Sequence, residues 1–208
     1  MNSRSRDDVS ALPLTASATG LELGRKALFA ALAVVFVGTA AQLAVPVPGT
    51  PVPISLQDLA VLMVGVVLGP RLGAAALVAY LGVGAMGAPV FSNGHAGLPW
   101  LLAATGGYLL AYPAAAWIMG RATASRPRRL LLAAFGALAA QAVVYAGGVS
   151  QLMVLTGQDV ATTAMLGVVP FLPGVVLKTG LILAFVAGLE HLAPRSGTDG
   201  PAGGTAPR

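Results

Sequence analysis

Long apolar stretches, separated by clusters of proline, glycine and charged residues, dominate the chain. A helix that spans a hydrocarbon core of about 30 Å needs roughly 20 apolar residues, and Pro and Gly clusters mark where one helix ends and the next begins. The pattern predicts six membrane-spanning helices, at 26–45, 55–69, 71–88, 100–120, 129–156 and 170–193. The second and third are short and are joined only by Gly69-Pro70-Arg71, which predicts a hairpin.

The composition strengthens this interpretation. Of the 208 residues, 56% are hydrophobic and 9% are charged, whereas a soluble domain carries about 25% charged residues. Residues 1–24 and 195–208 lack the apolar content to fold, so we expect two disordered tails around one transmembrane domain at 25–194. The first segment also lacks the apolar core of a signal peptide. The expected fold class is an all-α integral membrane protein.

Basic residues are distributed unevenly between the two sides of the predicted bundle. The connecting segments 45–54, 88–99 and 157–169 contain no Lys or Arg. Eleven of the 12 Lys and Arg residues fall on the opposite side, which the positive-inside rule identifies as the cytoplasm. We therefore expect both termini in the cytoplasm. The twelfth basic residue, Lys178, lies inside the last helix.

Lys178 is the leading candidate for a functional residue. It lies about two helical turns from the outer end of the last predicted helix. An ionisable side chain at membrane depth is energetically costly and is by default a candidate functional group. Two interpretations stay open: Lys178 snorkels to the outer interface, or it is the counter-ion of a carboxylate ligand that enters from outside.

The loop at 89–97 and the start of the fourth helix add further candidates for a ligand site. Phe91, Asn93 and Gly94 lie in the loop, whose mixture of aromatic, amide and glycine suits closure over a small molecule, although an ordinary turn has a similar composition. A Thr-Gly-Gly-Tyr run, which we expect inside the fourth helix, permits close approach of a helix or a ligand. It contributes Thr105, Gly107 and Tyr108.

The second and fifth helices supply the remaining polar candidates. Ser55 is the expected N-cap of the second helix, and Asp58 in its first turn complements the helix dipole. Gln57 needs both a donor and an acceptor partner where it is partly buried. Tyr145 is a further candidate in the fifth helix, although periodicity does not fix the direction in which it faces.

The absence of several motifs narrows the class of function. The chain contains no cysteine, its two histidines are far apart, and it has no G-x-x-x-x-G-K-[ST] phosphate loop. We therefore expect no metal site, no cofactor and no catalytic residue, so an enzyme is disfavoured. The net charge of +5 comes without a basic patch interleaved with aromatic residues, so nucleic acid is not an expected partner.

Four segments carry a family resemblance. They read PVPISLQDLAVLMVGVVLGPRLGA, YLGVGAMGAPVF, TGGYLLAYPAAAWIMG and PFLPGVVLK, in this order between Ala27 and Gly188. The series resembles the BioY family of biotin transporters, the substrate-binding S components of energy-coupling-factor (ECF) transporters. The resemblance implies a six-helix S-component fold in the bacterial cytoplasmic membrane, with biotin bound near the outer face under the first and third outer loops.

The resemblance also suggests roles for the candidates. Lys178 would bind the carboxylate of biotin, and Asn93 and Gln57 its ureido group. Three aromatic side chains would form the walls of the site: Phe91, Tyr108 and Tyr145.

The resemblance further implies partner proteins. These are a transmembrane coupling protein (T component) and two ATP-binding-cassette ATPases, which would supply the phosphate loops that this chain lacks. Ala27 and Ala31 match the small-residue motif by which S components dock on the coupling protein. Close packing within the chain is the other interpretation of two alanines four residues apart.

One position departs from the family pattern. The pattern after the proline of the last helix is Asp-x-x-Lys, but this chain has Val175 in place of the Asp. Positions i and i+3 share a helix face, so Lys178 has fewer partners when the site is empty. Three hypotheses follow: Asp58 substitutes, a water substitutes, or the lysine is partly neutral.

The predicted function is high-affinity biotin binding and uptake as the S component of an ECF transporter. One alternative is a stand-alone carrier, in which copies of this chain form a homo-oligomer and need no ATPase. Val175 motivates another, an S component for a different carboxylate vitamin. A membrane scaffold or membrane enzyme is the remaining alternative.

Overall fold

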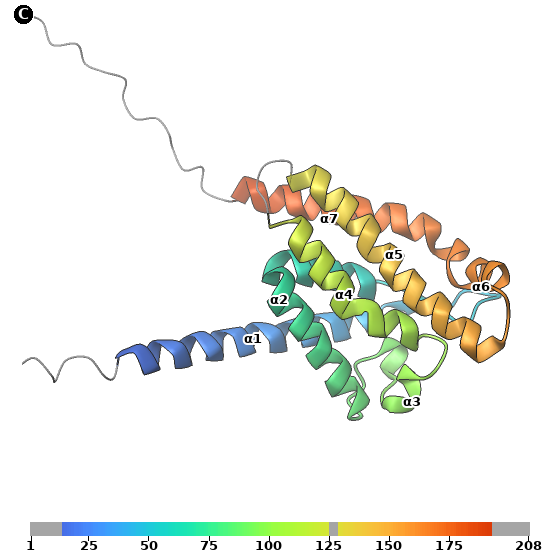
Figure 1. The fold of residues 1–208 in the computed structure, drawn as a ribbon, viewed down its shortest axis with the longest axis horizontal. Coiled ribbons are helices and arrows are strands. Elements are labelled where there is room, and N and C mark those ends of the chain that lie inside the picture. Colours follow the sequence, from blue (N-terminus) through green and yellow to red (C-terminus); the bar gives the residue numbers. More distant parts are fainter. Residues whose placement is uncertain (1–13, 125–128, 193–208) are drawn as a thin grey trace, which may run out of the picture.

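The computed structural model describes residues 14–124 and 129–192, which are largely helical (Figure 1). The long helices are α1 (Leu14–Gln42), α2 (Gln57–Ala85), α4 (Gly106–Ala122), α5 (Arg129–Thr156) and α7 (Leu172–Leu192). The short elements are the helices α3 (Leu98–Leu101) and α6 (Val160–Gly167) and the 3-10 turns η1 (Ser92–Gly94) and η2 (Val169–Phe171). Strands β1 (Ala44–Val45) and β2 (Ile54–Ser55) pair antiparallel, with Ala44 opposite Ser55.

The helices have the length and surface of a membrane protein. In the described ranges, four helical stretches are long and apolar enough to cross a bilayer: Gly20–Gln42, Gln57–Ala85, Arg129–Thr156 and Val160–Leu192. Large apolar side chains such as Phe36 and Phe135 point outward, and extensive exposed apolar surface is typical of contact with lipid. The predicted fold class, an all-α integral membrane protein, is confirmed.

Helix α2 folds back on itself at Gly69. The backbone there has φ 74° and ψ 178°, a left-handed conformation that glycine adopts readily, and Pro70 interrupts the helical hydrogen bonds. A Cβ atom on Gly73 would lie 3.3 Å from the Cα of Gly65, although eight residues of straight helix would separate the two by about 12 Å. The two limbs therefore pack side by side, as the predicted hairpin requires.

Contacts between glycines hold α2, α4 and α5 together at the centre of the molecule. A side chain at Gly120 would collide with the backbone of Pro70, and one at Gly107 with that of Gly147. Small residues at such crossings let helix backbones touch. In the most apolar windows of the α1 and α6–α7 stretches 17% of the residues are buried, against 44% in α2. Helices α1 and α7 are therefore peripheral (Figure 1).

The predicted helix 100–120 is wrong over its first turn and a half. Helix α3 ends at Leu101, and α4 begins directly after Thr105, so the Thr-Gly-Gly-Tyr run starts outside the helix. The Nε2 atom of Gln151 donates hydrogen bonds to the carbonyls of Leu101, at 3.0 Å, and Ala103, at 2.7 Å. A side chain on α5 thus bonds two carbonyl groups at the break, of which that of Ala103 also accepts a hydrogen bond from the backbone N–H of Gly106, at 3.0 Å.

The segment 157–169, predicted as a loop, contains α6. Asp159 is its N-cap, because its Oδ1 accepts hydrogen bonds from the backbone N–H groups of Ala161, at 2.9 Å, and Thr162, at 3.1 Å. The Thr162 hydroxyl also donates to this carboxylate, and these bonds lower the pKa of Asp159 below its ordinary 3.8. An Asp followed by a short apolar run is a start signal for a helix.

Ser55 does not have its predicted role as N-cap. It lies in β2, and Leu56 occupies the N-cap position of α2 without a side-chain capping bond. The Ser55 hydroxyl still accepts a hydrogen bond from the backbone N–H of Gln57, at 3.4 Å. Pairing with β1 therefore takes precedence over capping at this position.

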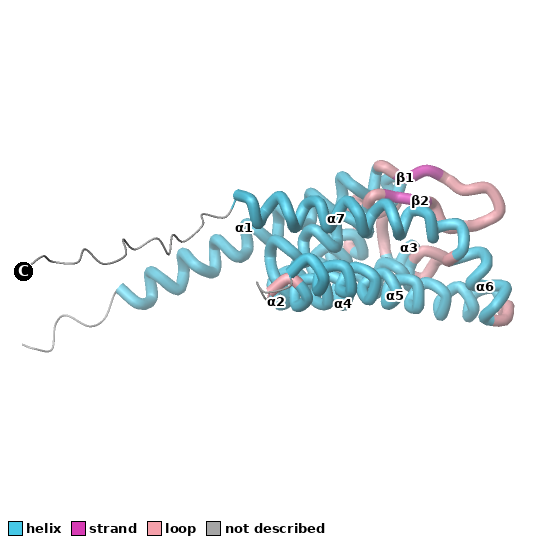
Figure 2. Tube along the Cα trace, turned by 90° about the horizontal axis from the view of Figure 1, so that it is seen from above, coloured by secondary structure: helices cyan, strands magenta, loops and turns pink. Residues whose placement is uncertain are grey.

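The two predicted tails are only partly described. Helix α1 begins at Leu14, so the helix extends into the segment 1–24 for which we expected no fold. Residues 1–13 and the predicted tail at 195–208 lie outside the described residues, as do Arg126 and Arg128. The start of α1 and the end of α7 lie at one end of the molecule, and the strands and α6 lie at the other (Figure 2).

Candidate ligand-binding site

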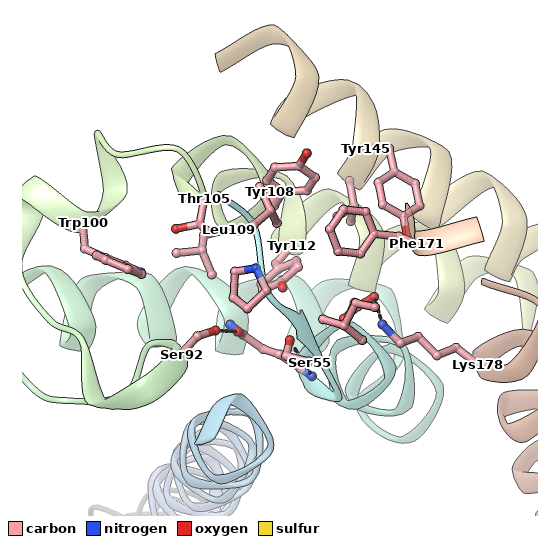
Figure 3. A pocket seen from close by; sticks show the side chains of 16 residues that line it. Ser55, Ser92, Trp100, Thr105, Tyr108, Leu109, Tyr112, Tyr145, Phe171 and Lys178 are labelled. Atoms are coloured by element: carbon pink, nitrogen blue, oxygen red, sulfur yellow. Dashed lines mark hydrogen bonds and ion pairs between the residues drawn. The ribbon is translucent and has the colours of Figure 1, made fainter. Parts of the chain in front are cut away.

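A cavity of about 50 Å³ lies at the end of the molecule that carries the strands and α6 (Figure 3). Its wall combines the segment before α2, residues 52–55, with side chains from the starts of α2, α4 and α7 and from α5 and η2. These segments are distant in sequence. The site therefore depends on the whole helix arrangement rather than on one motif.

An ion pair joins α2 to α7 at the cavity wall. The Nζ atom of Lys178 lies 2.6 Å from Oδ2 of Asp58, and the two side chains are 8% and 17% exposed. Lys178 lies two turns into α7 and lines the cavity (Figure 3). Asp58 also lines it. The lysine does not reach the surface by snorkelling, because its side chain is buried. Of the three hypotheses for the partner of Lys178, the structure shows Asp58.

A neutral hydrogen-bond network connects Gln57 with the second limb of α2 and the loop after it. The Gln57 Nε2 donates to the hydroxyl of Tyr80 at 2.8 Å, and this hydroxyl donates to the carbonyl of Val90 at 2.8 Å. The Ser92 hydroxyl donates to Gln57 Oε1 at 3.2 Å. Gln57 is 1% exposed, so its buried amide has both partners that it requires. The network fixes the Gln57 and Ser92 side of the cavity.

Aromatic rings form the opposite wall. Tyr145 makes an edge contact with Tyr108, at a centroid distance of 6.3 Å, and lies 6.3 Å from Phe171. The Tyr108 hydroxyl donates to the carbonyl of Gly167 at 2.8 Å, which fixes that ring. Tyr112 and Trp100 also line the cavity (Figure 3). Such walls can bury a flat apolar ring system.

Thr105 contributes a hydroxyl that is available for a ligand. Its Oγ1 atom is buried and has no hydrogen-bond partner among the described residues. The side chain lines the cavity just before α4 begins. A buried hydroxyl without a partner is energetically unfavourable, so a ligand that bonds to Thr105 would relieve this cost.

The structure brings five of the nine predicted site residues to the cavity. These are Gln57, Thr105, Tyr108, Tyr145 and Lys178. The other four lie elsewhere: Phe91, Asn93, Gly94 and Gly107.

The positions of these four residues have structural explanations. Phe91 is fully buried, with an edge contact to Tyr80, and covers Gly84. Asn93 and Gly94 are exposed in η1, both with positive φ angles. Gly107 is at the contact of α4 with α5. They shape or connect the elements around the site and do not line the cavity.

Sequence patterns did not single out several residues of the wall. Tyr112 and Phe171 line the cavity, as do Ser92, Trp100 and the segment 52–55. For Tyr112 a usable signal existed, because it follows the predicted Tyr108 by one helical turn and therefore shares its face. No local pattern indicates that η2 turns Phe171 inward.

The predicted docking residues Ala27 and Ala31 lie away from the cavity. Both are exposed on α1, so close packing within this chain does not account for them. In the described ranges there is no group of three or more His, Asp or Glu side chains that could hold a metal ion.

Comparisons with known proteins agree with this architecture. The sequence pattern of the BioY family matches residues 12–195. A probable biotin transporter BioY of Pyrococcus horikoshii is 36% identical over 165 residues, which are 78% of this chain and 93% of that protein. The biotin transporter BioY of Rhizobium etli is 37% identical over 136 residues, or 62% of this chain and 72% of its own length.

A solved structure has the same fold. The crystal structure of the S component for biotin from an ECF-type ABC transporter matches with a TM-score of 0.71 and 24% identity, covering 87% of this chain and 95% of that one. The expected S-component fold is thereby confirmed. Since the family pattern spans all of the described residues, this chain is a member of the BioY family.

Proposed function

We propose that this chain binds biotin in the cavity beside Lys178 and takes it up across the cytoplasmic membrane as the S component of an ECF transporter. The observation that carries the proposal is the buried Lys178 ammonium in the wall of a cavity with polar and aromatic sides. A buried charge at membrane depth indicates a functional site. The BioY relatives and the matching S component for biotin support the choice of ligand.

The chemistry of biotin matches this wall. Its carboxylate would pair with Lys178, which has N–H donors beyond the one used by Asp58. Its ureido group both donates and accepts, and would bond to Thr105 and to the network of Gln57. Its apolar thioether ring would pack between Tyr108 and Tyr145. The cavity is smaller than the 300–1,000 Å³ typical of ligand pockets, so entry of biotin requires the wall to move outward.

The segment 52–55 is the part of the wall best suited to move. It enters the wall from a long connection between α1 and α2 whose only regular structure is the two-residue ladder of β1 and β2. A pair of such short strands is only marginally stable by itself. We propose that this segment opens to admit biotin and closes behind it.

Transport would require partner proteins. We propose a transmembrane coupling protein that docks at the exposed Ala27 and Ala31 on α1, with two ATP-binding-cassette ATPases to supply energy. We also propose six membrane crossings, by α1, the two limbs of α2, α4, α5 and α7, with both termini in the cytoplasm. The common end of the first and last described helices is consistent with this orientation (Figure 2).

Titration of the purified full chain with biotin and with biotinamide tests the ligand assignment. We expect biotin to bind and to raise the melting temperature, because a ligand that binds only the folded state stabilises it. Lys178→Met should lose at least about 100-fold in biotin affinity, in the range of a buried charge pair. Lys26→Met, which removes an exposed lysine on α1, is the matched control and should bind as the wild type does. A wild-type chain indifferent to biotin would refute the proposal.

A further inference from the structure

The cavity wall contains a carboxylate as well as the lysine. Asp58 lies in the first turn of α2, and among the described acidic residues it alone lines the cavity. Its Oδ2 is 2.6 Å from Nζ of Lys178 in a largely buried pair. Burying a lone ammonium is very costly, and a hydrogen-bonded carboxylate offsets much of that cost. Asp58 therefore neutralises Lys178 in the structure.

This carboxylate comes from a different helix than the lysine. In the Asp-x-x-Lys pattern that the family resemblance implies, the acid would lie three residues before the lysine, on the same face of the same helix. This chain has Val175 there, a partly buried apolar residue that does not line the cavity. The negative charge instead arrives from α2, 120 positions away in sequence.

We propose that Asp58, the counter-ion of Lys178, sets how strongly the site prefers a charged carboxylate ligand. The inference rests on the proposed function, because the ligand in question is biotin. In the empty site Asp58 positions the ammonium and takes the place of the ligand's carboxylate. When the ligand arrives, both carboxylates share the three N–H donors of one lysine.

Sharing one ammonium has a measurable cost. Two carboxylates that each contact the same nitrogen at hydrogen-bond distance are at most about 6 Å apart. At an effective dielectric constant of about 20, the repulsion of unit charges at that separation corresponds to about 100-fold in affinity. Water that reaches the 17% exposed Asp58 side chain screens part of this repulsion, so we expect about tenfold. Asp58 therefore reduces the advantage of biotin over an uncharged analogue of the same shape.

The ratio of biotin affinity to biotinamide affinity reads out this effect. A variant that merely loosens the fold weakens both ligands together, so the ratio separates electrostatic discrimination from structural damage. We expect Asp58→Asn to raise the ratio about tenfold above wild type. Adding Val175→Asp to that variant should return the ratio toward the wild-type value, because the second substitution places a carboxylate on the same face of α7 as Lys178.

Thermal unfolding without ligand provides a second measurement. Asp58→Asn should lower the melting temperature, and Asp58→Asn/Val175→Asp should recover part of the loss. Asp159→Asn is the matched control, since it removes an exposed carboxylate outside the cavity, and its ratio should equal that of wild type. If Asp58→Asn does not fold, Val175→Asp in the wild-type background should lower the ratio about tenfold, by adding a second acid beside Lys178.

Each outcome bears on one claim. If the ratio is unchanged in Asp58→Asn, the inference is refuted. The same holds for Val175→Asp if Asp58→Asn does not fold. Biotin binding by the wild type would still support the proposed function. Failure of wild type to bind biotin refutes the proposed function. In that case the melting temperatures without ligand still show whether an acid at position 175 can replace Asp58 as the partner of Lys178. A double variant Asp58→Asn/Val175→Asp that is no more stable than Asp58→Asn would show that it cannot.

Discussion

The two ends of the first limb of α2 differ in whether the charged side chains beside them are buried. At one end Asp58 meets Lys178 in a largely buried pair beside a cavity of about 50 Å³. At the other end Arg71, Lys26 and Arg121 line an open hollow of about 610 Å³ and are all exposed. The first end encloses its charges, whereas the second leaves them in contact with the surroundings.

The difference in burial between the two ends indicates which charged residues have a specific role. Exposed basic residues cost the fold little, and in the proposed orientation the positive-inside rule explains their place. A buried pair must recover a large desolvation cost through good geometry and is weak evidence for stability alone. The burial of a charged side chain therefore indicates its role better than its position on a helix does. Four substitutions test the contrast between the two ends.

Lys178→Met should have the largest effect on stability. It leaves the Asp58 carboxylate, 17% exposed, without its partner, so we expect the free energy of unfolding to fall by about 3 kcal/mol. Arg121→Met at the other end should change it by no more than about 0.5 kcal/mol. Thermal or denaturant unfolding in detergent compares the two. Equal losses would remove the distinction between the ends.

Gly148→Ala should disturb the same end by packing rather than by charge. A methyl group there would overlap the ring of Tyr108, and overpacking costs about 1–3 kcal/mol. Displacement of the ring would also break its hydrogen bond to Gly167, so biotin affinity should fall about tenfold. In Gly180→Ala the added methyl group meets no atom within 4 Å. Isothermal titration should show unchanged biotin affinity for this control.

Tyr80→Phe tests the neutral network. The substitution removes the hydroxyl that accepts from Gln57 and donates to Val90, so a buried amide and a partly buried carbonyl each lose a partner, at a cost of about 1–2 kcal/mol. Because Tyr80 does not line the cavity, affinities for biotin and biotinamide should weaken by the same factor. A change in their ratio would contradict a purely positioning role.

Asp159→Asn should have the smallest effect, because this carboxylate is exposed, although it lies at the end of the molecule that contains the cavity. Its hydrogen bonds, first that from Thr162, lower its pKa below 3.8. Its contribution to stability is therefore present above the unfolded-state pKa and is lost as the pH falls through the lower folded-state pKa. The variant should melt slightly below wild type near neutral pH, and the difference should vanish in acid. A gap that widens in acid would contradict the assignment.

Composition and the proline and glycine breaks were sufficient to predict a helical membrane protein, and Gly69-Pro70 marked the fold-back of α2. The same signals misplaced the start of α4, because the bonds from Gln151 that stabilise the break after Leu101 come from a different helix. Helix α6 has a local signal in Asp159, but its eight residues are too short to register as a membrane span.

The site was less predictable than the fold. Lys178 could be identified from the sequence, because it is a single basic residue inside the apolar run of a predicted membrane helix. Recognising it does not require knowledge of its partner. Phe91 and Asn93 have suitable chemistry, yet packing against Tyr80 and a left-handed turn place them away from the cavity. The pairing of Asp58 with Lys178 depends on how α2 and α7 pack against each other. From the sequence alone, this pairing was only one of several hypotheses.

The glycine contacts at the centre of the molecule have a mechanical consequence. Where backbones touch, as at Gly107 and Gly147, helices cannot slide without collision, so α2, α4 and α5 form a stiff frame. Helix α7 buries Lys178, Ile182 and Val186 but exposes much of its remaining surface, and can tilt more freely. Lys178, the proposed anchor of the ligand, is thus on the less constrained helix, and Asp58, the proposed competitor of the ligand, is on the rigid frame. Amide exchange along α7 should therefore slow on biotin binding while exchange in α2 stays nearly constant.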